Sequence, residues 1–429
     1  MIEATFEGLL WLALAAALAP IIVDIIPKVP VPVVVVEIAL GILFGPYLLD
    51  VIEHSTGLEI AKEFGVIFLF FLAGFEVDFE GIKGEPLKNA LTGWVGSIII
   101  ALAIAFTLQQ LDLISSFHLF AIAIATTALG PLMPILQDSG QIHTKFGSNA
   151  LSIGAVGEFL PVLAVAFLFN DTRESQITAL VLIAFFAIVG VLLYGFRRGV
   201  GQKEDSQTRR IIVDTLNSSA QFAVRLSILI LVVLVYLTAR FDLDVLLGAF
   251  AGGFIIGQLG DVASTSESRK VMEWLKVKLE SIGFGVFIPA FFVMTGADLQ
   301  LDTLFSSNRA LVIMVLTIAA FLLIRGLPVL GLYRSLDGGM RFRLALIAST
   351  QLPLVATLMN RLVESGDVPE DIATAVIAGS VLTVALFPII AFIGVEDEEE
   401  PLIWGAIRRR VKPAVEALPA IEAREENDE

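Results

Sequence analysis

Apolar runs of about 20 residues recur along nearly the whole chain, from residue 4 to residue 394. A run of this length matches the hydrocarbon core of a bilayer, which is roughly 30 Å thick. In lipid the backbone must satisfy its own hydrogen bonds, so such runs form helices, and they are too continuous for alternating barrel strands. The sequence therefore predicts an all-α polytopic membrane protein with about 13 transmembrane helices. The predicted spans are 4–26, 31–47, 59–77, 89–109, 116–137, 146–169, 177–196, 219–239, 243–260, 282–297, 310–332, 342–363 and 371–394.

Lysine and arginine determine the predicted orientation. If the N-terminus is outside, most of the 28 Lys and Arg residues fall in inner loops, and every inner loop carries at least one. Because cytoplasmic loops carry such an excess, we expect a protein of the cell membrane with an outer N-terminus and a cytoplasmic C-terminus. The transmembrane domain is predicted to cover residues 1–394, and residues 395–429 to form an acidic, disordered cytoplasmic tail.

The two halves of the sequence resemble each other. Gly74 and Gly296 lie 222 residues apart within similar apolar segments, and Pro131 and Pro353 have the same separation. Agreement at two independent places predicts an internal repeat. A single helix between the halves makes the topology inverted, which is a device of secondary transporters. The two repeat units and the helix that links them are predicted at residues 4–169, 219–394 and 177–196, respectively.

The repeated element contains prolines in mid-membrane. Proline removes a backbone donor and frees polar groups, which lipid tolerates only where they are buried or line a watery cavity. The ends of the resulting half-helices can bind ions. A simple proline kink is the alternative, but matched breaks in both repeats favour an ion site, where the two broken helices are expected to cross. The predicted break residues are Gly130, Pro131, Pro134 and Pro353, and the predicted ion-binding residues beside them are Thr126, Thr127, Thr350 and Gln351.

Few ionisable residues lie inside the predicted spans. Glu158 lies midway along its span, where a carboxylate is costly unless it is protonated or paired. Burial favours the protonated form, whereas a bound cation or the intramembrane Arg325 favours the ionised form. Glu158 is therefore predicted to hold either a proton or a metal ion, Na⁺ or K⁺, with Arg325 as its charge partner. The alternative is a static Glu158–Arg325 pair that only holds the protein together.

Three other charged residues in or near the predicted spans are weaker candidates for an ion-binding role. Glu37 is either a structural acid or part of an ion path. Asp24 and Arg225 lie near the inner ends of their spans, where long or terminal side chains can reach the interface.

Composition excludes several kinds of site. The chain has 56% hydrophobic and only 17% charged residues, whereas soluble proteins carry roughly 25% charged residues. Cysteine is absent, and the three histidines do not have metal-ligand spacing. No nucleophile and base form a catalytic arrangement, so we expect no enzyme activity, no cofactor and no nucleic-acid partner.

Several motifs together resemble the monovalent cation:proton antiporter superfamily, in particular the branch of the glutathione-gated potassium-efflux and NapA-like sodium/proton antiporters. The similarity covers about residues 5–394. The motifs that carry it are VVVVEIALGILFGPYLLD (33–50), LFFLAGFEVDFEGIK (69–83), TTALGPLMPILQDSGQIHTKFGSNALSIGAVGE (126–158) and FIPAFFVMTGADLQL (287–301).

The resemblance implies a homodimer in lipid, with a dimerisation domain and a core domain that moves in an elevator-like cycle. It places the family's ion-site acid at Glu158, its crossing-helix threonine at Thr127 and its basic residue at Arg325. The family commonly has Asp-Asp or Asn-Asp where this chain has Gly157 and Glu158. One titrating carboxylate argues for electroneutral exchange of one cation for one proton. No glycine-rich nucleotide-binding motif follows residue 394, so gating by a nucleotide is not expected.

Two other functions remain open from the residues. One is a Na⁺-coupled transporter of an organic solute with the same architecture, which would need a roomier and more polar cavity. The other is a membrane sensor that transports nothing. In such a sensor the Glu158–Arg325 pair would be structural, and Glu158→Gln would leave the measured ion flux unchanged because there is none.

Overall fold

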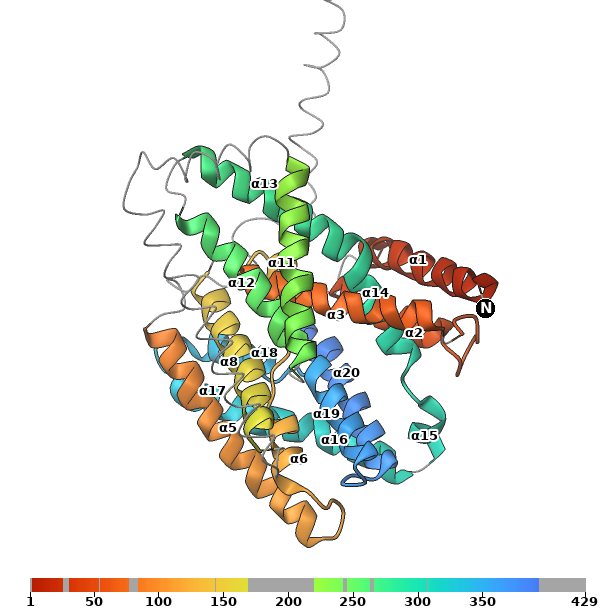
Figure 1. Ribbon diagram of the computed structural model, residues 1–429. Coiled ribbons are helices and arrows are strands. Elements are labelled where there is room, and N and C mark those ends of the chain that lie inside the picture. The colour runs from red at the N-terminus through yellow and green to blue at the C-terminus, as the bar shows by residue number, and fades with distance from the viewer. Residues whose placement is uncertain are drawn as a thin grey trace, which may run out of the picture.

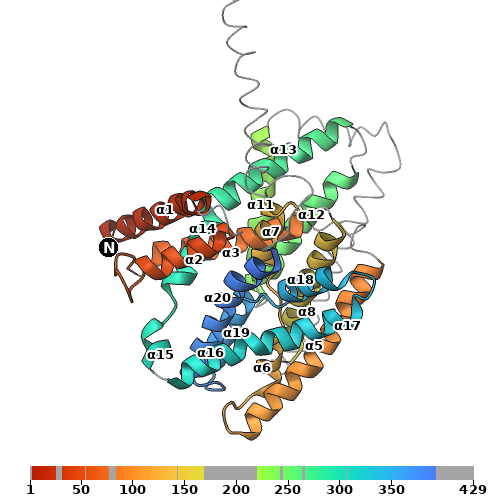
Figure 2. The same cartoon turned by 180° about the vertical axis from the view of Figure 1, so that it is seen from behind.

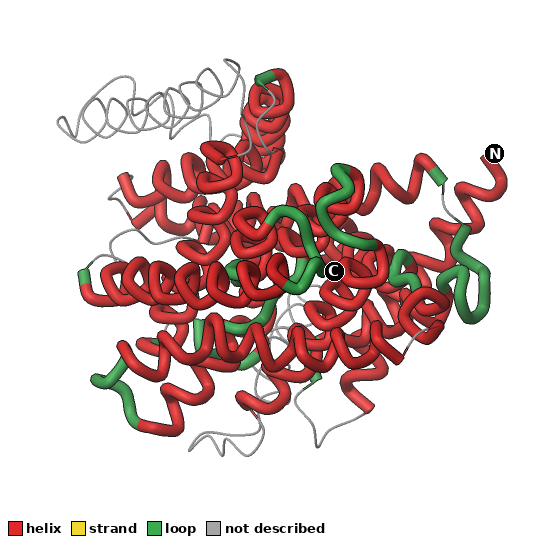
Figure 3. Tube along the Cα trace, turned by 90° about the horizontal axis from the view of Figure 1, so that it is seen from below, coloured by secondary structure: helices red, strands yellow, loops and turns green. Residues whose placement is uncertain are grey.

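The computed structural model of the protein describes residues 2–25, 31–53, 55–76, 84–142, 144–168, 220–241, 245–262, 266–306 and 308–392. Within these ranges the regular structure is helical, and Figure 3 shows no strand among them. Eight of the described helical stretches are long and apolar enough to cross a membrane, and three shorter apolar helices accompany them. This is the multi-span helical architecture that the apolar runs predict.

The first half of the chain contains α1 (Ile2–Ile25), α2 (Val33–Phe44), α3 (Thr56–Glu76), α5 (Glu85–Gln110), α6 (Phe117–Ile124), α7 (Leu129–Asp138) and α8 (Lys145–Leu168). The second half contains α11 (Ala220–Arg240), α12 (Val245–Val262), α13 (Ser266–Ile282), α14 (Ile288–Ala297), α15 (Leu301–Ser306), α16 (Asn308–Phe321), α17 (Leu327–Leu332), α18 (Gly338–Ala348), α19 (Pro353–Glu364) and α20 (Glu370–Phe392). Apart from 177–196, the described part of every predicted span is largely helical. That span and the tail at 395–429 lie outside the described residues, so the total of thirteen stays a prediction.

The helices pack as two units, to which both halves of the chain contribute. Helices α1, α2, α3, α11, α12, α13 and α14 contact one another extensively and form the scaffold unit. Helices α5 to α8 and α16 to α20 form the site unit (Figures 1 and 2). The units meet where α3 contacts α7 and where α2 contacts α20.

Glycines allow the scaffold helices to approach closely. A Cβ atom on Gly253 of α12 would lie 1.8 Å from the carbonyl oxygen of Phe71 on α3, and one on Gly74 would lie 2.2 Å from that of Phe250. Small residues are common at such helix crossings in membranes, where van der Waals packing takes the place of hydrophobic association. The α3–α12 contact is therefore made backbone to backbone.

The close α3–α12 contact predicts that a larger residue at Gly253 destabilises the protein, and the neighbouring Gly252 provides a control. Gly253→Ala forces α12 away from α3, and overpacking of this kind costs about 1–3 kcal/mol or more. We expect a clear fall in the thermal unfolding temperature of the purified protein. Gly252→Ala is the control, because its Cβ would have 3.4 Å to the Cα of Leu231. Equal unfolding temperatures for the two variants would contradict the close contact.

Two wide helical turns interrupt long helices in the second half. The π-helices η1 (Gly283–Phe287) and η2 (Leu322–Gly326) are each followed by a helix with proline in its first turn, Pro289 and Pro328, respectively. Proline lacks the N–H that would close an ordinary turn, which accounts for the wider one. Such turns redirect side chains and are frequent at functional sites.

The predicted span 282–297 is too short. Helix α13 leads through η1 directly into α14, so the helix begins at Ser266. Helix α13 carries several Lys and Glu residues on an amphipathic surface. These charged residues interrupt the apolar pattern, so α13 was not included in the predicted span.

Candidate ion-binding site

Two helices of the site unit are broken at corresponding places. Helix α6 ends at Ile124 and α7 begins at Leu129, while α18 ends at Ala348 and α19 begins at Pro353. The residues between them, 125–128 and 349–352, are not helical. The predicted pair of broken helices is therefore present.

The prolines lie beside the breaks rather than in them. Gly130 and Pro131 belong to the first turn of α7, Pro134 lies within α7, and Pro353 is the first residue of α19. Proline fits a first helical turn, because the N–H groups there have no partner inside the helix. The starts of α7 and α19 are 224 residues apart, so Pro131 and Pro353 do not occupy equivalent positions, although the sequence spacing of 222 suggested that they do.

Each break caps the helix end of the other repeat. The Thr127 hydroxyl donates to the carbonyl oxygen of Ala348, the last residue of α18, at 2.7 Å. The Gln351 side-chain amide donates to the carbonyl oxygen of Ile124, the last residue of α6, at 3.1 Å. Thr127 and Gln351, like Ile124 and Ala348, are 224 residues apart, so the capping is reciprocal and follows the internal repeat. The backbone N–H of Ala128 also donates to the Thr350 carbonyl at 2.9 Å.

Glu158 reaches this crossing from α8. Its side chain is 2% exposed, and Oε2 accepts a hydrogen bond from the backbone N–H of Leu129 at 2.9 Å. Leu129 is the first residue of α7, so the carboxylate lies at the N-terminal end of a half-helix. The partial positive charge there stabilises an anion. The backbone N–H of Thr127 donates to the Gly157 carbonyl at 3.0 Å, which ties α8 to the first break.

Arg325 enters from η2 and is 3% exposed. Its Nε donates to the Thr127 hydroxyl at 2.7 Å, and its Nη1 donates to the Ser97 hydroxyl at 3.2 Å. Its Nη2 lies 3.4 Å from the Ile153 carbonyl oxygen. The guanidinium thus joins α5, the first break and α8. Ser97 was not predicted, because a serine in an apolar span commonly bonds only a carbonyl of its own helix. Ser97 donates to the Gly93 carbonyl in this way and also accepts from Arg325.

Glycine at position 157 makes room for this arrangement. A Cβ atom there would lie 2.5 Å from Arg325 Nη2 and 2.8 Å from the Cβ and Oγ1 of Thr127. The side chains of Arg325 and Thr127 therefore occupy the space that any larger residue at 157 would need. Glycine at position 157 and the position of the Arg325 side chain therefore depend on each other.

The other predicted ligands form a second cluster of polar side chains around the breaks. Thr126 Oγ1 and Gln351 Oε1 are 3.1 Å apart, and the Gln351 backbone N–H donates to the Thr383 hydroxyl at 3.2 Å. The Thr350 hydroxyl donates to the Ile347 carbonyl at 2.7 Å. All four side chains are buried. Thr383 of α20 was not predicted, because nothing in its local sequence distinguishes it from other threonines in spans.

We expect the Thr127 hydroxyl to be required for both stability and transport. Thr127→Val keeps the shape but removes both the cap on α18 and the acceptor for Arg325. Loss of a bond to a charged group costs about 1.5–3 kcal/mol, so we expect lower stability and about a tenfold or greater loss of transport rate. Thr127→Ser keeps the hydroxyl and should retain most activity. Equal activity of the Val and Ser variants would show that the hydroxyl is dispensable.

The donor set suits a monovalent cation better than a resident transition metal. Among the described residues, no three His, Asp or Glu side chains gather as a metal site. Glu158 supplies one carboxylate beside the two breaks, and the residues of the breaks carry hydroxyl and backbone carbonyl oxygens. Oxygen ligands of this kind suit hard cations.

The remaining charged residues lie elsewhere. Glu37 is 5% exposed and lines a cavity of about 1320 Å³ in the scaffold unit, between α1 and η1. Asp24 and Arg225 are exposed near helix ends.

Comparisons with known proteins assign the chain to a family. The sequence pattern of the family described as "Sodium/hydrogen exchanger, transmembrane" matches residues 13–395. The chain belongs to this family. It is a family of membrane transporters, not of enzymes, and the chain is a multi-pass membrane protein, as predicted.

Individual relatives are distant but cover much of the chain. A Bacillus subtilis protein, YjbQ, whose name assigns it to the Na⁺/H⁺ antiporters, is 27% identical over 83% of this chain. The "Probable Na(+)/H(+) antiporter 3" of Methanocaldococcus jannaschii is 26% identical over 86% of the chain. The "Na(+)/H(+)-K(+) antiporter GerN" of Bacillus cereus is 26% identical over 74%. The matches span 57%, 92% and 78% of these relatives' own lengths, respectively.

A solved structure confirms the predicted fold class. The sodium proton antiporter MjNhaP1 from Methanocaldococcus jannaschii superposes with a TM-score of 0.62, covering 90% of this chain and 96% of its own. The sequence identity is 16%, so the likeness concerns the fold alone.

Proposed function

We propose that the protein exchanges a monovalent cation, Na⁺ or K⁺, for protons across the cell membrane. The observation that carries the proposal is the buried Glu158 carboxylate at the N-terminus of α7, where two broken helices cross. The names of the relatives, which include Na⁺/H⁺ and Na⁺/H⁺-K⁺ antiporters, support the same activity.

The chemistry follows from one carboxylate serving two ligands. The ionised form of Glu158 is favoured by the α7 N-terminus and by a bound cation, while burial away from water favours the protonated form. A proton on the carboxyl removes the charge that the cation needs. Each ion therefore displaces the other, and coupling requires no further machinery at the site.

Arg325 supplies a fixed positive charge beside the site. Its guanidinium is held by Thr127, Ser97 and the Ile153 carbonyl. With one titrating carboxylate, one cation leaves for each proton that enters, and we propose electroneutral exchange. A transport current that reverses with voltage would contradict this stoichiometry.

The two helical units support an elevator-like cycle in which the site unit moves against the scaffold unit. Contacts between the units include the rings of Phe159 and Phe250, with centroids 4.0 Å apart, and the close approach of Leu69 to Gly130. Apolar contacts can be exchanged during sliding without leaving polar groups unpaired. The scaffold unit would then remain in place in the lipid and form the homodimer.

Competition predicts a definite pH dependence. Over the pH range in which protons occupy Glu158, each unit fall in pH should raise the cation concentration for half-maximal rate about tenfold. The maximal rate at saturating cation should change less. The measurement is the initial rate of exchange against cation concentration at several symmetric pH values. A half-maximal concentration that is constant with pH would exclude a shared site.

The deciding experiment uses proteoliposomes that contain a pH dye and carry an imposed pH gradient. Addition of Na⁺, K⁺ or Li⁺ should collapse the gradient for at least one cation. If no cation does so between acidic and alkaline pH, the exchange proposal fails. Gradient collapse that requires an organic solute as well would favour the solute-transporter alternative, and no flux of any kind would favour the sensor.

A further inference from the structure

A small basic pocket lies at one end of the scaffold unit, away from the ion site. It has a volume of about 420 Å³ and lies between the start of α11 and the end of α13. Its lining residues are Val224, Arg225, Lys278, Ser281 and Ile282. Two of the five are therefore cations and two are apolar.

The two cations lack an acidic partner within the described part of the chain. Lys276 and Glu280, on the same helix, form an ion pair at 3.9 Å, but neither Arg225 nor Lys278 takes part in one there. Lys278 instead places its Nζ 3.6 Å from the ring centroid of Trp274. Two like charges that line one pocket repel each other unless an anion lies between them. The Ser281 hydroxyl donates to the Val277 carbonyl, so recognition rests on the two cations.

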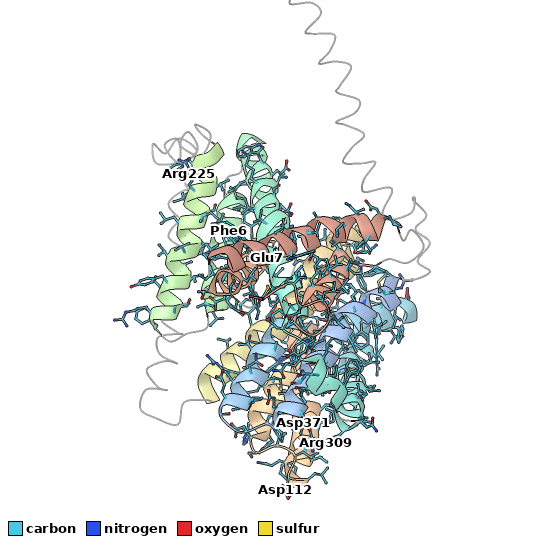
Figure 4. All side chains as sticks on the ribbon, turned by 90° about the vertical axis from the view of Figure 1, so that its right-hand side faces the viewer. Phe6, Glu7, Asp112, Arg225, Arg309 and Asp371 are labelled. Atoms are coloured by element: carbon cyan, nitrogen blue, oxygen red, sulfur yellow. The ribbon has the colours of Figure 1, made fainter. Side chains whose placement is uncertain are left out.

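The pocket lies at the predicted cytoplasmic membrane surface. Figure 4 shows Arg225 near the start of α11, at the opposite end of the molecule from Asp112, Arg309 and Asp371. The latter three residues belong to loops and helix ends that the lysine and arginine pattern places outside. Anionic lipids are enriched in the cytoplasmic leaflet and attract basic groups there.

The surroundings of the pocket are apolar and exposed. Along α11 the side chains of Leu229, Val232, Val233 and Tyr236 are all more than 40% exposed, and Val277 beside the pocket on α13 is 59% exposed. Trp274 is partly exposed as well, and indole rings favour the headgroup level of a bilayer. A ligand for this place needs an anionic group for the cations and apolar chains for the surface next to them.

We propose that Arg225 and Lys278 bind the phosphate of an anionic phospholipid from the cytoplasmic leaflet. The acyl chains of the lipid lie along the exposed apolar surface of α11. The bound headgroup joins α11 to α13 by charge and stabilises this corner of the scaffold unit. The inference concerns lipid binding and is independent of the transported ion.

The test compares lipids and charge-matched variants by thermal unfolding and native mass spectrometry. In detergent, phosphatidylglycerol should raise the unfolding temperature of the wild type more than phosphatidylcholine does, and should remain bound in the mass spectrum. Each basic residue near an anionic lipid surface contributes substantially to the free energy of binding. Arg225→Gln/Lys278→Gln should therefore weaken phosphatidylglycerol binding about tenfold or more. Arg225→Lys/Lys278→Arg keeps both charges and should bind normally.

The control variant is Arg240→Gln/Arg361→Gln, which removes two exposed cations from the other end of the molecule. It should keep the full response to phosphatidylglycerol. Three results would overturn the proposal: the same loss of response in both double variants, no loss in either, or equal stabilisation of the wild type by phosphatidylcholine. Equal stabilisation by glycerol phosphate or inorganic phosphate would identify a soluble-anion site instead and would also refute the lipid proposal.

Discussion

We expect Glu158→Gln to abolish cation-driven proton movement, to the level of empty liposomes. Glutamine keeps the shape and can still accept the hydrogen bond from the Leu129 N–H, but it cannot carry a charge or release a proton. Both halves of the exchange therefore fail together. The measurement is dye-reported gradient collapse on addition of Na⁺, K⁺ or Li⁺, with the amount of reconstituted protein verified.

Two controls separate the charge of Glu158 from general effects. Glu158→Asp keeps the carboxylate on a shorter side chain and should retain exchange with a weaker apparent affinity for the cation. Glu364→Gln removes an exposed carboxylate at the end of α19 and should leave exchange intact. Exchange by Glu158→Gln at a rate near that of the wild type would remove Glu158 from the mechanism and leave it a structural acid.

Gly157→Ala should have the second largest effect. The added methyl group would lie 2.5 Å from Arg325 Nη2 and 2.8 Å from Thr127, so either the guanidinium or the first break must shift. Overpacking costs about 1–3 kcal/mol, and the displaced groups belong to the ion site. We expect at least about a tenfold loss of exchange rate and a lower unfolding temperature. The two are measured on the same preparation.

The matched control is a second helical glycine with open space around it. Apart from its chain neighbours and the backbone of its own helix, no atom lies within 4 Å of a Cβ built on Gly331 of α17. Gly331→Ala should leave transport unchanged and stabilise the helix by up to about 1 kcal/mol. If Gly157→Ala behaved like Gly331→Ala, the space beside Arg325 would not matter for exchange.

The sequence was sufficient to predict the helices and the buried charged residues, because both follow from the cost of placing polar groups in lipid. A carboxylate and a guanidinium within apolar spans are rare enough to single out Glu158 and Arg325 without a structure. Polar residues beside prolines within apolar spans likewise located the two breaks to within a few residues. These signals are strong because the membrane penalises each exception to the apolar pattern.

Features set by packing between distant helices could not be predicted. Ser97 and Thr383 look ordinary in their own spans and acquire roles only because Arg325 and Gln351 reach them from other helices. The role of Gly157 depends in the same way on where the side chain of Arg325 ends. The local sequence does not indicate which side chains from distant helices will contact a residue.

The reciprocal caps have a consequence for biogenesis. The Ile124 carbonyl receives its partner from Gln351, which the ribosome adds 227 residues later. At 5–20 residues per second that delay is roughly 10–45 seconds. During this time the end of α6 lacks its native cap in a medium where an unsatisfied carbonyl costs several kcal/mol. The second half, by contrast, finds Thr127 already in the bilayer when Ala348 arrives. Insertion of the first half therefore precedes its final folding, and a nascent chain cut short before residue 351 presents an unfinished helix end to the membrane's quality control.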